Sequence, residues 1–89
     1  MNHVNTQRQA IAACLDHDPR IRSVFANVSL KKYSCHADPV TSYMVSIQGG
    51  YGHDWCYIGE STESLNRATL NALAEFERGV ERGEVHDAE

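Results

Sequence analysis

The sequence predicts an α+β fold, a single domain in which a three-stranded antiparallel sheet carries helices on one face. Three observations support this prediction. Stretches near both ends of the chain place apolar residues at helical spacing, the segments between them alternate apolar and polar residues, and glycines and prolines separate the segments. The predicted order is therefore α-β-β-β-α. We expect this domain to span residues 1–83 and a flexible acidic tail to span residues 84–89.

The first predicted helix begins at Thr6. Thr6 and Gln9 fit a capping box, in which each side chain satisfies a backbone donor of the other residue. Asp18-Pro19 ends the helix, because the residue before a proline avoids the α region. The expected apolar face consists of Val4, Ile11, Cys14 and Leu15.

Three strands follow in the prediction. Residues 22–33 alternate apolar and polar side chains with Phe25 as the exception, and residues 43–48 alternate in the same way. A glycine-rich turn at 49–52 precedes a more apolar strand at 55–58. We expect an antiparallel meander whose polar face looks outward, and this open face is the default binding surface.

The last predicted helix has Ser61 or Thr62 as its N-cap. At 100° per residue its apolar side chains share one face, with Leu70 as the exception. The residues expected to face the sheet are Leu65, Ala68, Thr69, Ala72, Leu73, Phe76 and Val80.

The composition and net charge of the chain argue against several kinds of function. The 89 residues carry a net charge of −4, which does not favour holding a phosphate backbone by bulk electrostatics. We expect no membrane span and no signal peptide, because the chain has neither a long apolar run nor a charged leader followed by an apolar stretch. Three cysteines are an odd number for a disulfide framework, so the cytoplasm is the expected compartment.

The sharpest candidate for metal chemistry is the set Cys35, His36, His53 and Cys56. Two thiolates and two imidazoles suit tetrahedral zinc, and the four residues meet if the loop after the first strand lies near the turn before the third. Their spacing differs from the usual zinc patterns, however, and the simpler interpretation is two buried or half-buried cysteines and two surface histidines. We predict no metal and no cofactor, and we keep this zinc set as an alternative.

We find no constellation typical of an enzyme. No nucleophile, paired carboxylates or cofactor loop stands in a suitable context, and the 49–52 glycines lead into a strand instead of a helix N-terminus. We predict a protein partner, which aromatic and acidic side chains would contact. Trp55 and Tyr57 share a strand face, so at least one is expected in the core. The predicted partner-binding residues are Tyr51, Trp55, Tyr57, Glu60, Glu63, Glu75, Glu77 and Glu81.

The element order and residues 58–61 followed by 68–73 resemble double-stranded RNA-binding domains, where a glycine-serine turn leads into an alanine-rich helix. That family begins its last helix with lysines that grip phosphates. Here the matching positions are Thr62, Glu63 and Ser64. The resemblance therefore implies the topology, while the phosphate-gripping lysines of the family are missing.

Residues 43–76 also resemble small α/β-sandwich proteins of phages and prophages, with a strand ending in Gly-Gly, an aromatic strand and a Leu/Ala-rich helix. This resemblance implies a non-enzymatic binding protein in the cytoplasm of a bacterial host. Its specific form is an anti-CRISPR-like inhibitor that blocks a basic surface of a nucleic-acid-handling defence complex. The alternatives are a double-stranded-RNA-binding-like domain and a small zinc-binding protein. A homodimer formed through a strand edge or the sheet face is also compatible with the sequence.

Overall fold

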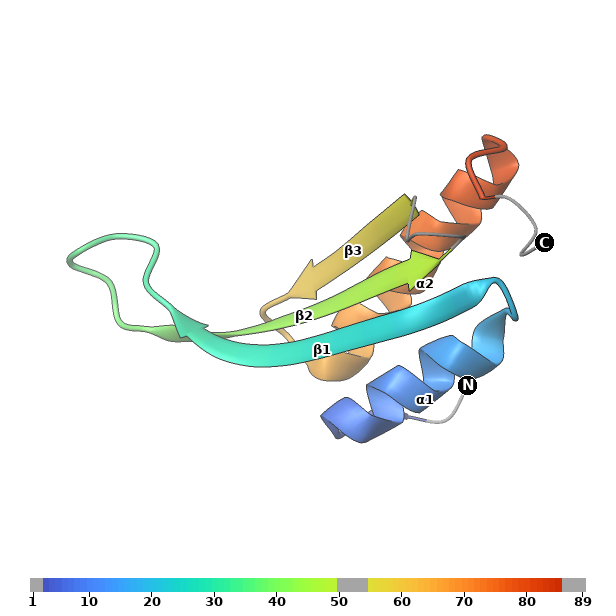
Figure 1. Cartoon of the computed structure of the whole chain (residues 1–89). Coiled ribbons are helices and arrows are strands. Elements are labelled where there is room, and N and C mark those ends of the chain that lie inside the picture. The colour runs from blue at the N-terminus through green and yellow to red at the C-terminus, as the bar shows by residue number, and fades with distance from the viewer. Residues whose placement is uncertain (1–2, 50–54, 86–89) are drawn as a thin grey trace.

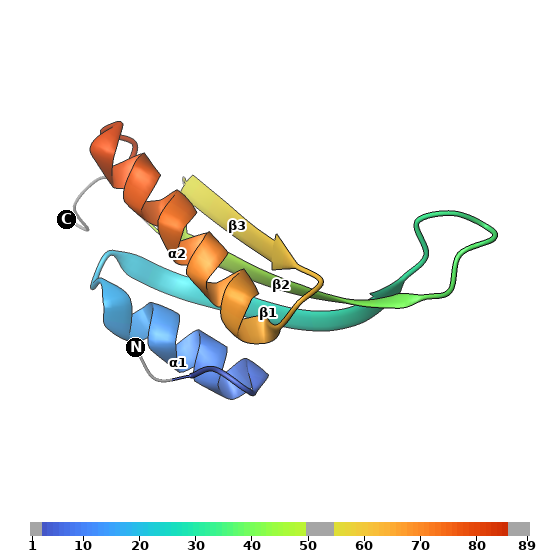
Figure 2. The same ribbon diagram turned by 180° about the vertical axis from the view of Figure 1, so that it is seen from behind.

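A three-stranded antiparallel sheet carries both helices on one face, as Figures 1 and 2 show from opposite sides. The computed structural model describes residues 3–49 and 55–85. The strands lie in the order β1-β2-β3, α1 packs on β1, and α2 packs on β3 and β2. The predicted α+β class and α-β-β-β-α order are confirmed. The elements are α1 (Gln7–His17), β1 (Ile21–Lys31), β2 (Val40–Gly49), β3 (Trp55–Ser61) and α2 (Leu65–Glu81).

The core lies between the sheet and α2. Every residue of the predicted apolar face from Leu65 to Phe76 is buried, and Val80 packs against the same cluster. Phe76 is fully buried, with its ring centroid 5.5 Å from the Trp55 ring and 6.4 Å from the Tyr57 ring. Leu70, the predicted exception, is exposed.

Gly59 allows α2 to approach β3 closely. A Cβ atom at this position would collide with the Ala72 amide nitrogen and the Ala68 carbonyl oxygen, both of which belong to the α2 backbone. Only a residue without a side chain therefore lets the helix lie this near the strand.

Helix α1 begins and ends where the sequence predicts. The Thr6 and Gln9 side chains form the capping box, and the helix ends before Asp18. Its buried residues are Ala10 and Cys14, one helical turn apart, and Val4 is also buried. The prediction that Leu15 faces the core is wrong, because Leu15 lies about 100° around the helix from Cys14 and is 41% exposed.

The start of α2 also differs from the prediction. Strand β3 continues through Ser61, which pairs with Tyr43, so neither Ser61 nor Thr62 caps the helix. Ser64 is the N-cap, and its hydroxyl accepts a hydrogen bond from the Arg67 amide at 3.0 Å. Cross-strand pairing therefore outweighs the capping propensity of the two earlier residues.

Glu84 and Val85, expected in the flexible tail, are held against the domain. The Glu84 amide donates to the Gly79 carbonyl at 2.9 Å, and the Gly83 amide donates to the Val80 carbonyl at 3.1 Å. Gly83 has φ +74°, so these bonds form a Schellman motif that ends α2. Val85 is buried beyond it, and residues 86–89 lie outside the described part of the chain.

The β1 and β2 strands extend past the rest of the sheet. Strand β3 ends opposite Tyr43, whereas β1 and β2 continue to pair from Ser29–Ser42 to Lys31–Val40. We call residues 29–42 the arm; it projects at the left of Figure 1. The arm explains the principal extents of 49 × 26 × 21 Å, because the seventeen-residue α2 helix is only ~26 Å long.

Candidate functional site

The predicted aromatic anchors face the helices. Trp55 is 7% exposed and contacts Phe76, and Tyr57 is partly buried against the same core. The Tyr57 hydroxyl donates to Glu84 at 2.8 Å, and burial together with this hydrogen bond raises the tyrosine pKa. Trp55 is therefore a core residue and not a surface anchor. Tyr51 lies outside the described residues.

The predicted acidic side chains do not form a uniform negative surface. Glu63 lies 3.6 Å from Arg67, and Glu75 is paired with Arg78. The hydrogen bond from Arg78 lowers the pKa of Glu75. Each pairing cancels local charge, so these acids attract a basic partner less than their number suggests.

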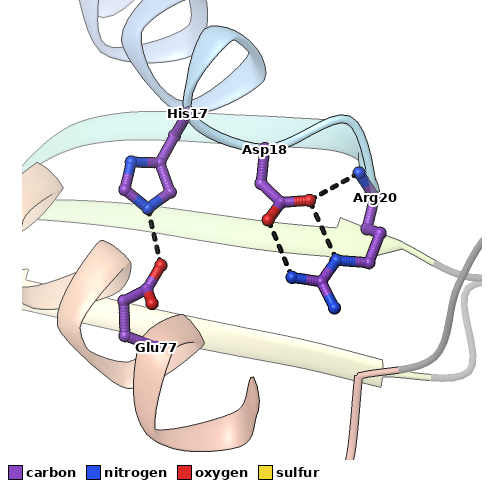
Figure 3. Close-up of polar contacts among 4 residues, drawn as sticks. All are labelled: His17, Asp18, Arg20 and Glu77. Carbon is purple, nitrogen blue, oxygen red and sulfur yellow. Dashed lines mark hydrogen bonds and ion pairs between the residues drawn. The ribbon is translucent and has the colours of Figure 1, made fainter. Parts of the chain in front are cut away.

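Glu77 pairs with a histidine from the other helix. Its carboxylate lies 2.8 Å from His17 Nε2, across the space between α2 and α1 (Figure 3). Among the described residues, the Glu60 and Glu81 carboxylates have no ion pair. The Glu60 backbone carbonyl accepts a hydrogen bond from the side-chain amide of Asn71 at 3.0 Å.

The structure does not bring the predicted zinc set together. Cys35 and His36 lie in the arm's connecting loop, whereas Cys56 lies near the start of β3. In a meander, successive turns lie at opposite ends of the sheet, so the hypothesis that these residues meet is wrong for the three described ones. His53 lies outside the described part of the chain. Among residues 3–49 and 55–85, no three His, Cys, Asp or Glu side chains are grouped as metal ligands.

The sheet face away from the helices is open and partly apolar. Phe25, Ser46 and Ile58 form a cross-strand row on this face. Phe25 is 58% exposed and Ile58 is 50% exposed, while Ser46 between them is buried. The expected outward-looking face is thus present, but its middle row carries two large apolar side chains, one on each outer strand.

Cys56 lies on the same open face. Its exposed thiol is 3.4 Å from the Ser46 hydroxyl and 3.9 Å from the Gln48 amide nitrogen. These neutral neighbours add polar contacts beside the apolar row.

The arm carries a second group of exposed apolar side chains. Leu30 is 72% exposed, Tyr33 is 68% exposed, and Val40 is also exposed. Leu30 alternates in phase with the buried Ala26, so it points to the helix side of the sheet, beyond the helices that would cover it. The apolar–polar alternation of the strand predicts the direction of the Leu30 side chain. The structure adds that no described residue packs over it.

Basic and acidic residues are concentrated in different parts of the sequence and of the fold. Residues 19–37 contain Arg20, Arg22, Lys31, Lys32 and no acidic residue. Residues 60–85 contain six acidic and three basic residues. The arm itself holds Lys31, Lys32 and Asp38, so it carries one net positive charge on a protein whose net charge is −4.

A hollow of about 450 Å³ lies beside α1. Its polar lining belongs mostly to the exposed side of that helix, and its His17 is already paired with Glu77. It is separate from both the open face and the arm. The lining residues are His3, Val4, Gln9, Ala12, Ala13, Asp16 and His17.

The comparisons with known proteins give no relative. No protein-family model matches the chain, and the searches of curated proteins and of solved structures found no match. In the described residues, neither helix has the length and hydrophobicity needed to cross a membrane. What the protein does is therefore inferred from the surfaces of the molecule itself.

Proposed function

We propose that this chain is a non-catalytic protein-binding domain whose arm is inserted into a partner. The observation that supports the proposal is the exposure of Leu30, Tyr33 and Val40 on a projecting hairpin. Soluble proteins expose single apolar residues routinely, but a local group on a protruding element is typical of an interaction site.

The arm has the composition of a contact element. Most of the Leu30 surface is available for burial, and burying a leucine side chain contributes about 1.5–3 kcal/mol. Tyrosine is among the residues that most often dominate binding energy, which makes Tyr33 the expected anchor. Lys31 and Lys32 flank these side chains and would favour a partner with an acidic rim.

A narrower form of the proposal has a basic partner, such as a nucleic-acid-handling defence complex blocked by a phage-encoded inhibitor. Its support is the net charge of −4 and the Glu60 and Glu81 carboxylates, which are not ion-paired within the described residues. Charge-reversal variants distinguish the two versions of the proposal, an acidic-rimmed partner and a basic one. K31E/K32E weakens binding to an acidic-rimmed partner, whereas E81K weakens binding to a basic one.

The test compares matched surface variants in a quantitative pull-down from host lysate, followed by calorimetry with the purified partner. The arm variant is L30S/Y33S. The control is L15S/L70S, which removes two exposed leucines from the helical layer. We expect the arm variant to bind at least about tenfold more weakly and the control to bind as wild type. Equal binding by the wild type and the arm variant would contradict the proposal.

Duplex RNA binding is a second candidate, favoured by the observed α-β-β-β-α order and the Lys31-Lys32 pair on the arm. Against it, the turn before α2 holds Thr62, Glu63 and Ser64 where lysines would grip phosphate. A mobility-shift assay with a long RNA duplex at low salt tests it. Binding that weakens with salt and is lost in K31E/K32E would support this candidate, and the absence of any shift would end it.

A further inference from the structure

The open face carries opposite charges at two diagonal corners. Glu60 follows Ile58 by two residues on β3 and pairs with Met44, which places it at one corner. Strand β1 has a register shift between Ile21 and Ser23. Ile21 is buried in the core, so by alternation the next residue, the exposed Arg22, points to the open face. The bulge leaves it beside Ser23, which pairs with Gln48, at the diagonally opposite corner.

Between these corners the face is neutral and partly apolar. Its middle row is Phe25, Ser46 and Ile58, and Met44 and Gln48 lie next to Ser46 along β2. The two remaining corners are Asn27 and Cys56, which carry no formal charge. Apart from the arm, the only charged residues of this described face are Arg22 and Glu60.

Such a pattern is self-complementary under one particular symmetry. A two-fold axis lying parallel to the face, along the diagonal from Asn27 to Cys56, exchanges the other two corners. Arg22 of each copy then faces Glu60 of the other copy, and two salt bridges form. The strands of the two sheets cross at a large angle, as in orthogonal sheet packing.

Other face-to-face arrangements lose this match. An axis along the Arg22–Glu60 diagonal places each charge against its own copy, which is repulsive. An axis parallel or perpendicular to the strands places both charges opposite the neutral corners, Asn27 and Cys56. Charge complementarity therefore selects a single orientation.

The same orientation also matches the apolar side chains. Phe25 of one copy lies over Met44 of the other, and Ile58 lies over Gln48, whose methylene groups can cover it. Ser46 lies near the axis, already buried beneath its neighbours. The two large exposed apolar side chains of the face, Phe25 and Ile58, are thus covered, as a stable interface requires.

We propose that the open sheet face binds the open face of a second copy of this chain, with Arg22 opposite Glu60 and Cys56 beside the two-fold axis. None of the proposed contact residues belongs to the arm, so this inference goes beyond the arm-binding proposal and does not depend on it.

Sedimentation velocity from micromolar to submillimolar concentration tests the dimer. We expect R22E and E60R each to raise the dimer dissociation constant at least about tenfold, because each places two like charges in contact across the interface. The double variant R22E/E60R restores opposite charges and should return the constant to near the wild-type value. F25S/I58S should sediment as a monomer, and L30S/Y33S as the wild type.

Crosslinking supplies a second readout. In a C35S background, a short bismaleimide should join Cys56 to Cys56 of the second copy, because Cys14 is buried. A wild-type monomer at every concentration would overturn the proposal, as would a dimer insensitive to the Arg22, Glu60 and Phe25 changes. If the wild type is a monomer and binds a different protein that the F25S/I58S variant no longer binds, the open face belongs to that protein. This result would also overturn the proposed dimer.

Discussion

The three cysteines of the chain have different surroundings. Cys14 is fully buried between α1 and the sheet, and burial raises the pKa of its thiol to about 11. Cys35 and Cys56 are exposed, in the arm and on the open face. Because the thiolate is the reactive form, burial suppresses the Cys14 reaction both by access and by ionisation.

We therefore predict that an aromatic disulfide reagent at pH 8 labels two thiols of the native protein rapidly and the third only as the protein unfolds. Absorbance of the released thiolate, with and without denaturant, measures this. The C14A variant is the control and should lose the slow phase alone. Three equally fast thiols in the native protein would contradict the burial of Cys14.

Asp18 ties the end of α1 to the start of β1. Its carboxylate accepts hydrogen bonds from the Arg20 amide at 2.8 Å and from the Arg20 guanidinium at 3.0 and 2.8 Å (Figure 3). These hydrogen bonds hold the pKa of Asp18 below its usual range, and the bonds from the guanidinium contribute most. The ionised form is thus the one that the fold stabilises.

A lowered folded-state pKa gives stability that is present above the unfolded pKa of ~3.9 and lost as pH falls through the folded pKa. We predict that D18N lowers the free energy of unfolding by about 1–3 kcal/mol at pH 7, and that its deficit shrinks in strong acid. Urea unfolding between neutral and acid pH measures both. D16N changes an exposed neighbour and should show neither effect.

Two glycines in the contact between α2 and β3 should respond differently to substitution by alanine. A Cβ on Gly59 meets the backbone of α2 at Ala68 and Ala72, which moves only if the whole helix moves. A Cβ on Gly79 meets the end of the Tyr57 side chain, which can rotate, and alanine also favours the helix.

We predict that G59A destabilises the protein by at least about 2 kcal/mol and that G79A costs clearly less. Chemical unfolding of the two variants under identical conditions gives the comparison. A G79A deficit as large as that of G59A would show that the Tyr57–Glu84 hydrogen bond, and not the helix–strand approach, controls this contact.

The sequence predicts the elements of the fold better than their ends. The apolar period of α2 is unambiguous because a long helix repeats it over several turns, and Thr6 with Gln9 marks the start of α1. The start of α2 is ambiguous because Ser61, Thr62 and Ser64 are all good caps. Pairing of β3 with β2 decides among them, and a single sequence does not contain that partner register.

The candidate surfaces are set by which parts of the sheet the two helices cover and which they leave exposed. Phe25 breaks the alternation of β1, and this is the sequence signal for an apolar open face. Leu30 follows the alternation and looks like a core residue, yet it lies past the helices. Similarly, Cys35 and Cys56 are compatible with one site until the meander places them at opposite ends.

The arm itself should contribute little to folding. Leu30, Tyr33 and Val40 are exposed, and no described residue of the connecting loop is buried. Replacing residues 32–39 with Asn-Gly shortens an eight-residue connection to a two-residue turn suited to the Lys31–Val40 pair. The free-energy cost of closing the loop, which is entropic, then falls by about 1 kcal/mol, and this favours the folded state.

We predict that the shortened protein unfolds with a free energy equal to or about 1 kcal/mol above that of the wild type, while it loses binding to the arm's partner. Urea unfolding and calorimetry with that partner measure the two properties. A variant with Asn-Gly inserted into the unaltered loop controls for the new residues. A shortened protein that fails to fold would mean that the arm stabilises the sheet, and its exposed side chains would then no longer indicate a surface kept for binding.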